Sequence, residues 1–384
     1  MRESADERHD RLLELVREQG SARVSDLAGQ LGVSPVTVRR DVETLAERGL
    51  LDRVHGSVSW PRSAASTAGA GAPPGGGGLV IGLLAPSATY YFAEVIRGAH
   101  DAAAQAGARL ILRISDYRPK EDKARSEGLL AAGAEGLLIA PGWQAAGDQA
   151  AYGDWMSELP VPAVLLERQP ALGSTLDDMD RVCSDHRHGV LLAVRHLVGL
   201  GHGAPLLVAR ADSPTALAVR AGYDEALGAL GLEQPRPVID SVPAELDRGR
   251  FEEAVRAVQT AVTTGGVTAA LVHNDVDAIH LVQRLAELGV RVPEDLALVA
   301  YDDEVAALAD TPLTAVAPPK RQVGLYGTRM LVERLSTGPR GRTPEPQDRE
   351  HQGRQEPGQQ EPGQHLALLP RLHVRDSCGA TAPR

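Results

Sequence analysis

Short apolar runs alternate with amphipathic segments along residues 79–303, and this alternation constrains the fold more than any other feature of the chain. The segments between the runs, such as AEVIRGAHDAAAQAG at 93–107, carry apolar residues at helical spacing. Strands that alternate with helices form βαβ units and parallel sheets. Seven such units are more than one small sheet usually contains. The pattern therefore predicts an α/β fold with two lobes. The apolar runs are LVIGLLAP (79–86), RLILRIS (109–115), GLLIAP (136–141), AVLLER (163–168), PLLVA (205–209), AALVHND (269–275) and LALVAYDD (296–303).

Changes in composition divide the 384 residues into a small and a large module. Residues 1–60 are charged and helix-patterned, whereas residues 61–78, PRSAASTAGAGAPPGGGG, have the composition of a flexible linker. Residues 79–384 form the large module. Within it, residues 337–365 contain QEPGQ twice and cannot bury apolar area, so we expect a disordered insertion before a last strand. The expected lobes are 79–182 with 316–336, and 183–315 with 366–378.

The small module has the pattern of a winged helix-turn-helix. Helices are predicted over residues 6–19 and 24–31, and GVS at 32–34 supplies the turn. A third helix starts at Ser34, a good N-cap, followed by Pro35 at a position where no donor is lost. Residues 48–60 then read as two short strands around a turn. The alternative is a three-helix surface subdomain with solvated arginines.

The run VTVRRD, followed by LAERGLLDRVHG, resembles the N-terminal domain of the DeoR family of bacterial transcriptional repressors over residues 6–58. The resemblance implies that the third helix enters the major groove of DNA and that the wing touches the backbone. The residues expected to contact DNA are Ser34, Thr37, Arg39, Arg40, Arg53 and His55.

Charge limits how this module could bind DNA. The whole chain has a formal net charge of −11, and residues 1–60 hold nine arginines against eleven acidic residues. The module therefore cannot bind through bulk positive charge. Affinity must come from a few placed contacts, which predicts a shallow salt dependence and a homodimer on paired half-sites of double-stranded operator DNA.

The large module resembles the effector domain of LacI-type repressors, which has the fold of periplasmic sugar-binding proteins. The most specific part of the match is the run HNDVDAIHLVQRLAELGVRVPEDLALVAYDD at 273–303. Ligands of such sheets bind outside the carboxyl ends of strands, where carboxylates and amides can hold sugar hydroxyls. The predicted ligand-binding residues are Tyr91, Phe92, Asp116, Glu167, Arg168, Arg220, Asn274, Asp275 and Asp302.

Two departures from that family affect the expected ligand. The family's ligand-binding arginine lies three residues before the glycine that corresponds to Gly222, but Val219 occupies that place and Arg220 follows one position later. One position turns a helical side chain by about 100°. The family's Asn-Pro-x-Phe is also replaced by TYYF at 89–92. An atypical sugar or a degenerate pocket is expected.

Other functions find less support. His273, Asp275, Asp277 and His280 suggest a metal, but they point in several directions from a strand end and a helix, so no metal and no cofactor is expected. No catalytic pair stands out, and the Gly-rich linker lacks the Lys-Ser/Thr of a phosphate loop. Two distant cysteines and the lack of a signal peptide or membrane span suggest a cytoplasmic protein. We therefore expect a sugar-controlled repressor of a carbohydrate-utilisation operon. The alternatives are a sugar-binding protein of a transport system and a sugar-active enzyme.

Overall fold

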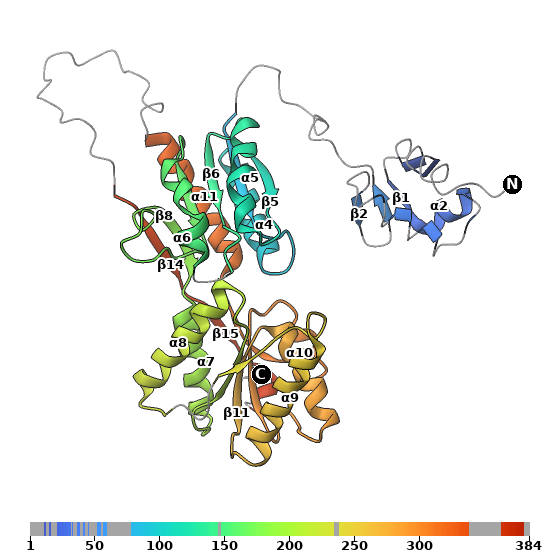
Figure 1. The fold of residues 1–384 in the computed structure, drawn as a ribbon, viewed down its shortest axis with the longest axis vertical. Helices are drawn as coiled ribbons and strands as arrows, with labels where there is room; N and C mark the ends of the chain where they lie inside the picture. The colour runs from blue at the N-terminus through green and yellow to red at the C-terminus, as the bar shows by residue number, and fades with distance from the viewer. Residues whose placement is uncertain are drawn as a thin grey trace, which may run out of the picture. The chain divides into compact units, whose positions relative to one another are not determined.

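The chain divides into two units, Met1–Gly76 and Gly77–Arg384, which are described separately (Figure 1). The structure is a computed structural model. It describes residues 11–12, 15–16, 21–31, 33, 37–38, 41–42, 45, 52–54, 57–59, 78–144, 147–233, 238–337 and 362–379. Residues 61–77 of the expected linker and residues 338–361 of the expected insertion lie outside this part of the chain.

The first unit contains helical segments with a shared apolar core and a small antiparallel sheet. Its described elements are β1 (Ser21–Arg23), α2 (Val24–Leu31), β2 (Asp52–Val54) and β3 (Ser57–Ser59). The strand order is β1-β3-β2, so β2 and β3 form the expected hairpin and β1 adds a strand that the sequence did not predict. The core contains Leu12, Val16, Leu27, Ala28, Leu31, Val38, Val42 and Leu45.

The first lobe of the second unit is a parallel six-stranded sheet with helices on both faces (Figure 1). In sheet order its strands are β14 (His365–Leu368), β8 (Asp180–Ser184), β7 (Ala163–Leu166), β6 (Gly136–Ile139), β4 (Val80–Ala85) and β5 (Arg109–Ile114). One face is covered by α4 (Tyr91–Gln105) and α11 (Lys320–Thr337). The other is covered by α5 (Pro119–Ala131) and the short helix η1 (Asp154–Glu158), next to α6 (Asp148–Tyr152).

The second lobe repeats this architecture with one antiparallel edge. In sheet order its strands are β10 (Ile239–Asp240), β9 (Leu206–Ala209), β11 (Ala269–His273), β12 (Ala297–Tyr301), β13 (Thr314–Ala317) and β15 (Arg371–His373), and β15 runs antiparallel to β13. Helices α7 (His186–Gly199) and α8 (Pro214–Leu230) cover one face. Helices α9 (Arg248–Thr263) and α10 (Asp275–Glu287) cover the other.

The chain crosses between the lobes three times: from β8 to α7, from β13 to α11, and from β14 to β15. These crossings correct the expected lobe boundaries. Strand β8 continues to Ser184 in the first sheet, and β13 continues to Ala317 in the second. Residues 366–378 do not all belong to the second lobe, because β14 pairs with β8 and only β15 joins the second sheet.

Candidate functional site

The first unit places few of the predicted DNA-contacting side chains. Ser34, Arg39, Arg40 and His55 lie outside the described residues. Thr37 is helical and half-buried, next to the buried Val38, and Arg53 lies on β2 of the hairpin. The buried side chains Val38, Val42 and Leu45 follow the helical spacing on which the third helix was predicted.

In the second unit, the carboxyl ends of the central strands gather most of the predicted ligand-binding residues between the lobes. Glu167 and Arg168 follow β7, and Asp302 follows β12. Tyr91 and Phe92 begin α4, next to the end of β4. Asp116 does not join them, because it follows β5 at the edge of the sheet and is exposed. It makes no hydrogen bond or ion pair with the cleft residues that the structure describes.

Glu167 is the centre of a buried hydrogen-bond network in the first lobe. Its Oε1 accepts from the Tyr91 hydroxyl at 2.8 Å and from Ser184 Oγ at 2.8 Å, and its Oε2 accepts from the Ser184 amide at 3.0 Å. His186 Nε2 lies 3.7 Å from Oε2. Burial opposes ionisation, but His186 and Ser184 together outweigh it and hold the pKa of Glu167 below its ordinary value. Glu167 is therefore a carboxylate whose two oxygens are already occupied.

Arg168 is a buried cation beside this network. Its Nε donates to the Pro141 carbonyl and its Nη1 to the Glu167 carbonyl, both at 2.9 Å, whereas Nη2 has no partner among the described residues. The guanidinium carbon lies 5.8 Å from the centre of the Phe92 ring. Burial lowers the pKa of Arg168, because the charged form loses hydration.

In the second lobe, the Asn274 and Asp275 side chains bond to the protein's own backbone amides. Asn274 Oδ1 caps α10 by accepting from the Asp277 amide at 3.1 Å. Asp275 Oδ2 accepts from the amides of residues 304, 305 and 306, at 2.7, 2.6 and 2.9 Å. These bonds fix the loop after β12, which positions Asp302.

Tyr90, which the sequence analysis did not select, joins the lobes. Its hydroxyl donates to Asp275 Oδ1 at 2.5 Å and lies 3.4 Å from Asp302 Oδ2. Its φ is 49°, in a region that residues with side chains rarely adopt. Burial and the two neighbouring carboxylates raise the pKa of the Tyr90 hydroxyl, so it stays a donor. The only sequence signal was the departure TYYF itself.

His273 and Lys320 were also missed, and both lie against Asp302. His273 Nε2 is 4.0 Å from Asp302 Oδ2, and burial lowers the pKa of His273 to about 3. Lys320 begins α11, directly after the second of the three crossings, and its Nζ donates to the Asp302 carbonyl and to the Glu304 carboxylate. Burial raises the pKa of Asp302 to about 6, although Lys320 opposes the shift.

Arg220 reaches the carboxyl end of the second sheet, where its guanidinium donates to groups of the protein itself. Its Nε donates to the Arg210 carbonyl at 2.9 Å, and its Nη2 donates to the Ala209 carbonyl at 2.5 Å and to Asp240 Oδ1 at 2.7 Å. It therefore anchors α8 to β9 and β10. Its neighbours Ala218 and Ala221, rather than Arg220, line the pocket described next.

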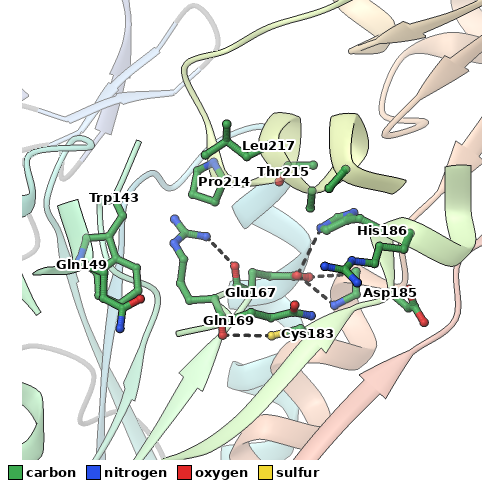
Figure 2. A pocket seen from close by; sticks show the side chains of 15 residues that line it. Trp143, Gln149, Glu167, Gln169, Cys183, Asp185, His186, Pro214, Thr215 and Leu217 are labelled. Carbon is green, nitrogen blue, oxygen red and sulfur yellow. Dashed lines mark hydrogen bonds and ion pairs between the residues drawn. The ribbon is translucent and has the colours of Figure 1, made fainter. Parts of the chain in front are cut away.

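A pocket of about 300 Å³ lies between the lobes (Figure 2). Trp143, Gln149 and residues 167–169 contribute from the first lobe, and residues 183–187 contribute from the crossing into α7. The N-terminal turns of α8, from Pro214 onward, close it from the second lobe. Figure 2 shows Glu167 and His186 on one side of this space and Trp143 on the other.

Two negative observations concern the described residues alone. They contain no group of three or more His, Cys, Asp or Glu side chains placed to hold a metal ion. None of their helices combines the length and apolar character needed to cross a membrane.

Comparisons with known proteins agree with this two-part organisation. Residues 8–64 match the family described as a DeoR-like helix-turn-helix domain, and residues 194–378 match the periplasmic binding protein-like domain. The chain is 27% identical to the HTH-type transcriptional regulator DegA of Bacillus subtilis, over 64% of this chain and 71% of that protein. It is 24% identical to the arabinose metabolism transcriptional repressor of Geobacillus stearothermophilus, over 81% of this chain and 83% of that protein.

Solved structures share the fold. A lac repressor dimer bound to operator and an anti-inducer superposes with a TM-score of 0.60 at 23% identity, covering 78% of this chain and 94% of that one. A complex of the transcriptional regulator CelR with cellobiose gives a TM-score of 0.61 at 22% identity, covering 90% of this chain and 91% of that one. The curated relatives are transcriptional regulators rather than enzymes.

Proposed function

We propose that the chain, which matches a DeoR-like helix-turn-helix domain and a periplasmic binding protein-like domain, is a DNA-binding transcriptional regulator. A sugar-like ligand bound between the two lobes controls its affinity for operator DNA. The observation that carries the proposal is the pocket of about 300 Å³ between lobes joined by three crossings. That volume suits a ligand of monosaccharide size. The printed names of an arabinose repressor and a cellobiose-bound regulator among the relatives support a carbohydrate operon.

The mechanism is a shift between populations of open and closed lobes. A ligand that contacts both lobes favours the closed arrangement by its differential affinity for the two states. In a homodimer, the change in lobe angle alters the spacing of the two DNA-binding units, and operator affinity changes with it. Because each unit has few cationic contacts, the dimer needs both half-sites, which makes binding sensitive to that spacing.

The DNA-binding proposal rests on the third helix and the hairpin of the first unit. Ser34, Thr37, Arg39 and Arg40 belong to the predicted recognition helix, and Arg53 and His55 to the wing. Arg39 and Arg40 supply positive charge on a module that is net acidic. Because the module is net acidic, general attraction to the phosphates cannot compensate for the loss of either arginine. Removing either one should therefore lower the affinity for DNA measurably.

Arg40→Ala is the direct test. The operator is first selected by the wild-type protein from random duplexes, and binding is then measured by fluorescence anisotropy at fixed salt. We expect a loss of about 10- to 100-fold or more, because one base or phosphate contact of an arginine is worth about 1–3 kcal/mol. Arg195→Ala, which removes an exposed arginine on α7 of the other unit, should leave the affinity unchanged. Equal affinities for wild type and Arg40→Ala would refute the assignment.

Ligand control is tested by footprinting the same operator with and without a panel of sugars. A ligand that raises the melting temperature of the protein by mass action should also change operator occupancy. Identical occupancy at saturating ligand would refute the control mechanism. A chain that binds sugar but no selected duplex would instead favour a sugar-binding role in transport.

A further inference from the structure

We propose that the pocket between the lobes binds an anionic group of the ligand, a carboxylate or a phosphate, and that Arg168 is its charged partner. This inference deepens the proposed function, since it names the chemical class of the ligand. It predicts a sugar acid or a sugar phosphate rather than a neutral sugar.

The first reason is that Arg168 is a buried positive charge without a carboxylate partner. Its side chain is 4% exposed, and both of its hydrogen bonds go to backbone carbonyls. Among the described residues, no carboxylate oxygen lies within ion-pairing distance of it. Burying a charge is costly, and two carbonyls and the Phe92 ring replace the lost hydration only in part, because no opposite charge pairs with Arg168.

Several half-buried arginines of this protein pair with a carboxylate, which the buried Arg168 does not do. Arg210 forms two hydrogen bonds with Asp212, at 2.8 and 2.7 Å, and Arg375 forms two with Asp303, at 2.7 and 3.1 Å. Arg334 and Arg284 pair in the same bidentate way with Asp180 and Glu252. In each case a planar guanidinium is matched by a planar carboxylate. At Arg168 no carboxylate of the described residues takes this position, and we assign it to an anionic group of the ligand.

The acids that line the pocket attract Arg168 only at longer range, because their oxygens accept hydrogen bonds from other groups. Both oxygens of Glu167 accept hydrogen bonds from Ser184, and one also accepts from Tyr91. Asp185, which also lines the pocket, caps α7 by accepting from the His188 amide at 2.9 Å. Neither carboxylate forms a hydrogen bond or an ion pair with the Arg168 guanidinium among the described residues.

Two further features of the same pocket also favour an acceptor-rich ligand. Trp143 is 5% exposed, and its indole N–H, which can only donate, has no partner among the described residues. Helix α8, of 17 residues, starts at the pocket with Pro214, so the positive end of its dipole faces the ligand. A buried guanidinium, an unused indole donor and a helix N-terminus all attract negative charge, and together they describe an anion subsite.

The experiment measures binding of matched neutral and acidic probes to the full chain by isothermal titration calorimetry. The panel contains common pentoses and hexoses, each beside its uronate, its aldonate and its phosphate ester, with inorganic phosphate as the bare group. We expect at least one acidic sugar to bind about tenfold or more tightly than its neutral counterpart, because hydrogen bonds to charged groups are the stronger class. Comparison of the carboxylate and phosphate series identifies which anion the pocket takes.

Variants assign the effect to Arg168. Arg168→Gln should lose the preference for the acidic probe, whereas Arg168→Lys, which keeps the charge, should retain part of it. Arg195→Gln removes a charge from the exposed face of α7 and should bind as wild type does. Circular dichroism melting checks that each variant is folded. If Arg168→Gln does not fold, the Lys variant and the neutral–acidic pairs on the wild type still decide the question.

The outcomes separate this inference from the proposed function. If a neutral sugar binds and releases the operator while its acidic counterparts do not bind, the anion subsite is wrong and the regulatory function stands. If an acidic sugar binds through Arg168 without changing operator affinity, the subsite stands and ligand control is wrong. If no acidic member of the panel binds, the inference is overturned.

Discussion

His273 ends β11 and Asp302 follows β12, both are buried, and burial shifts their pKa values in opposite directions. Burial lowers the pKa of His273 to about 3 and raises that of Asp302 to about 6. At neutral pH the imidazole is therefore uncharged, with one donor and one acceptor, and Asp302 is ionised at a cost. Both ring nitrogens and Asp302 Oδ1 have no partner among the described residues. They are buried and do not line the pocket at Arg168, so the cost of their burial falls on the stability of the fold.

Asp302→Asn should stabilise the protein above pH 6. The pKa of Asp302 is about 6 in the folded state and about 3.9 in an unfolded chain. The folded state therefore binds the extra proton, and stability contributed by this residue falls as pH rises from 3.9 to 6. We expect the Asn variant to be more stable by about 2–3 kcal/mol at pH 7.5, with about half of that difference remaining at pH 5.

Urea unfolding of both proteins at the two pH values measures this difference. His273 titrates in both proteins, so its own pH dependence cancels in the comparison. A stability difference that does not change between pH 5 and pH 7.5 would contradict the assigned pKa of Asp302.

At the scale of elements, α4 and α11 approach so closely that their backbones touch. A Cβ added at Gly98 would overlap the Arg321 carbonyl, and one added at Gly324 would overlap the Val95 carbonyl. Only glycine fits at these two facing positions. The contact fixes the register of α11, which begins with Lys320 at the edge of the cleft. The packing of α4 against α11 therefore sets the position of the Lys320 amine, which donates to the Asp302 carbonyl.

Gly324→Ala should destabilise the second unit by about 2–3 kcal/mol, because the helices must separate to admit the methyl group. Gly228→Ala is the matched control, since a Cβ there meets nothing within 4 Å on an exposed turn of α8. That substitution should be neutral or stabilise by up to about 1 kcal/mol. Thermal unfolding monitored by circular dichroism compares the two. Equal melting temperatures would mean that the helices can separate without cost.

At the scale of the molecule, the second unit consists of two lobes held by three crossings and by Tyr90. The crossings are short connections of one or two residues between elements of the two lobes, and such connections can act as hinges for rotation of one lobe against the other. Tyr90 opposes that rotation from within the cleft, since it belongs to the first lobe and donates to Asp275 in the second. In the absence of ligand, this bond favours closed lobes.

Tyr90→Phe should therefore loosen the closed arrangement. The loss of a donor to a buried carboxylate is worth about 1–3 kcal/mol. We expect a larger radius of gyration in small-angle X-ray scattering without ligand and a lower melting temperature. Tyr326→Phe, at a position on α11 that is 39% exposed, should change neither. An unchanged radius of gyration for Tyr90→Phe would show that the crossings alone hold the lobes.

The sequence predicted the α/β architecture well because each of the seven apolar runs contains a strand, and all but the edge strand β5 are largely buried. It did not single out β8, β10 or β13, since segments such as DRVCS are too polar or too short to stand out, and it expected one last strand where β14 and β15 form two. Glu167, Arg168, Asn274, Asp275 and Asp302 could be selected from the sequence because they directly follow apolar runs, and their role in ligand binding stays a prediction. Tyr90 and Lys320 could not be found in that way. The position of Tyr90 depends on an unusual backbone conformation. The position of Lys320 depends on the crossing from β13, which places the first residue of α11 next to Asp302 of the second lobe.

The interleaving of the two lobes sets the order in which the chain can fold during synthesis. The apolar face of α4 is buried by Val323 and Leu331 of α11, more than 200 residues later in the chain. A nascent chain that ends before α11 therefore exposes the face of the first sheet that α4 and α11 share. Domains ordinarily fold one after another as they leave the ribosome. Here the small N-terminal unit can do so, but the two lobes must wait and complete each other at nearly the same time.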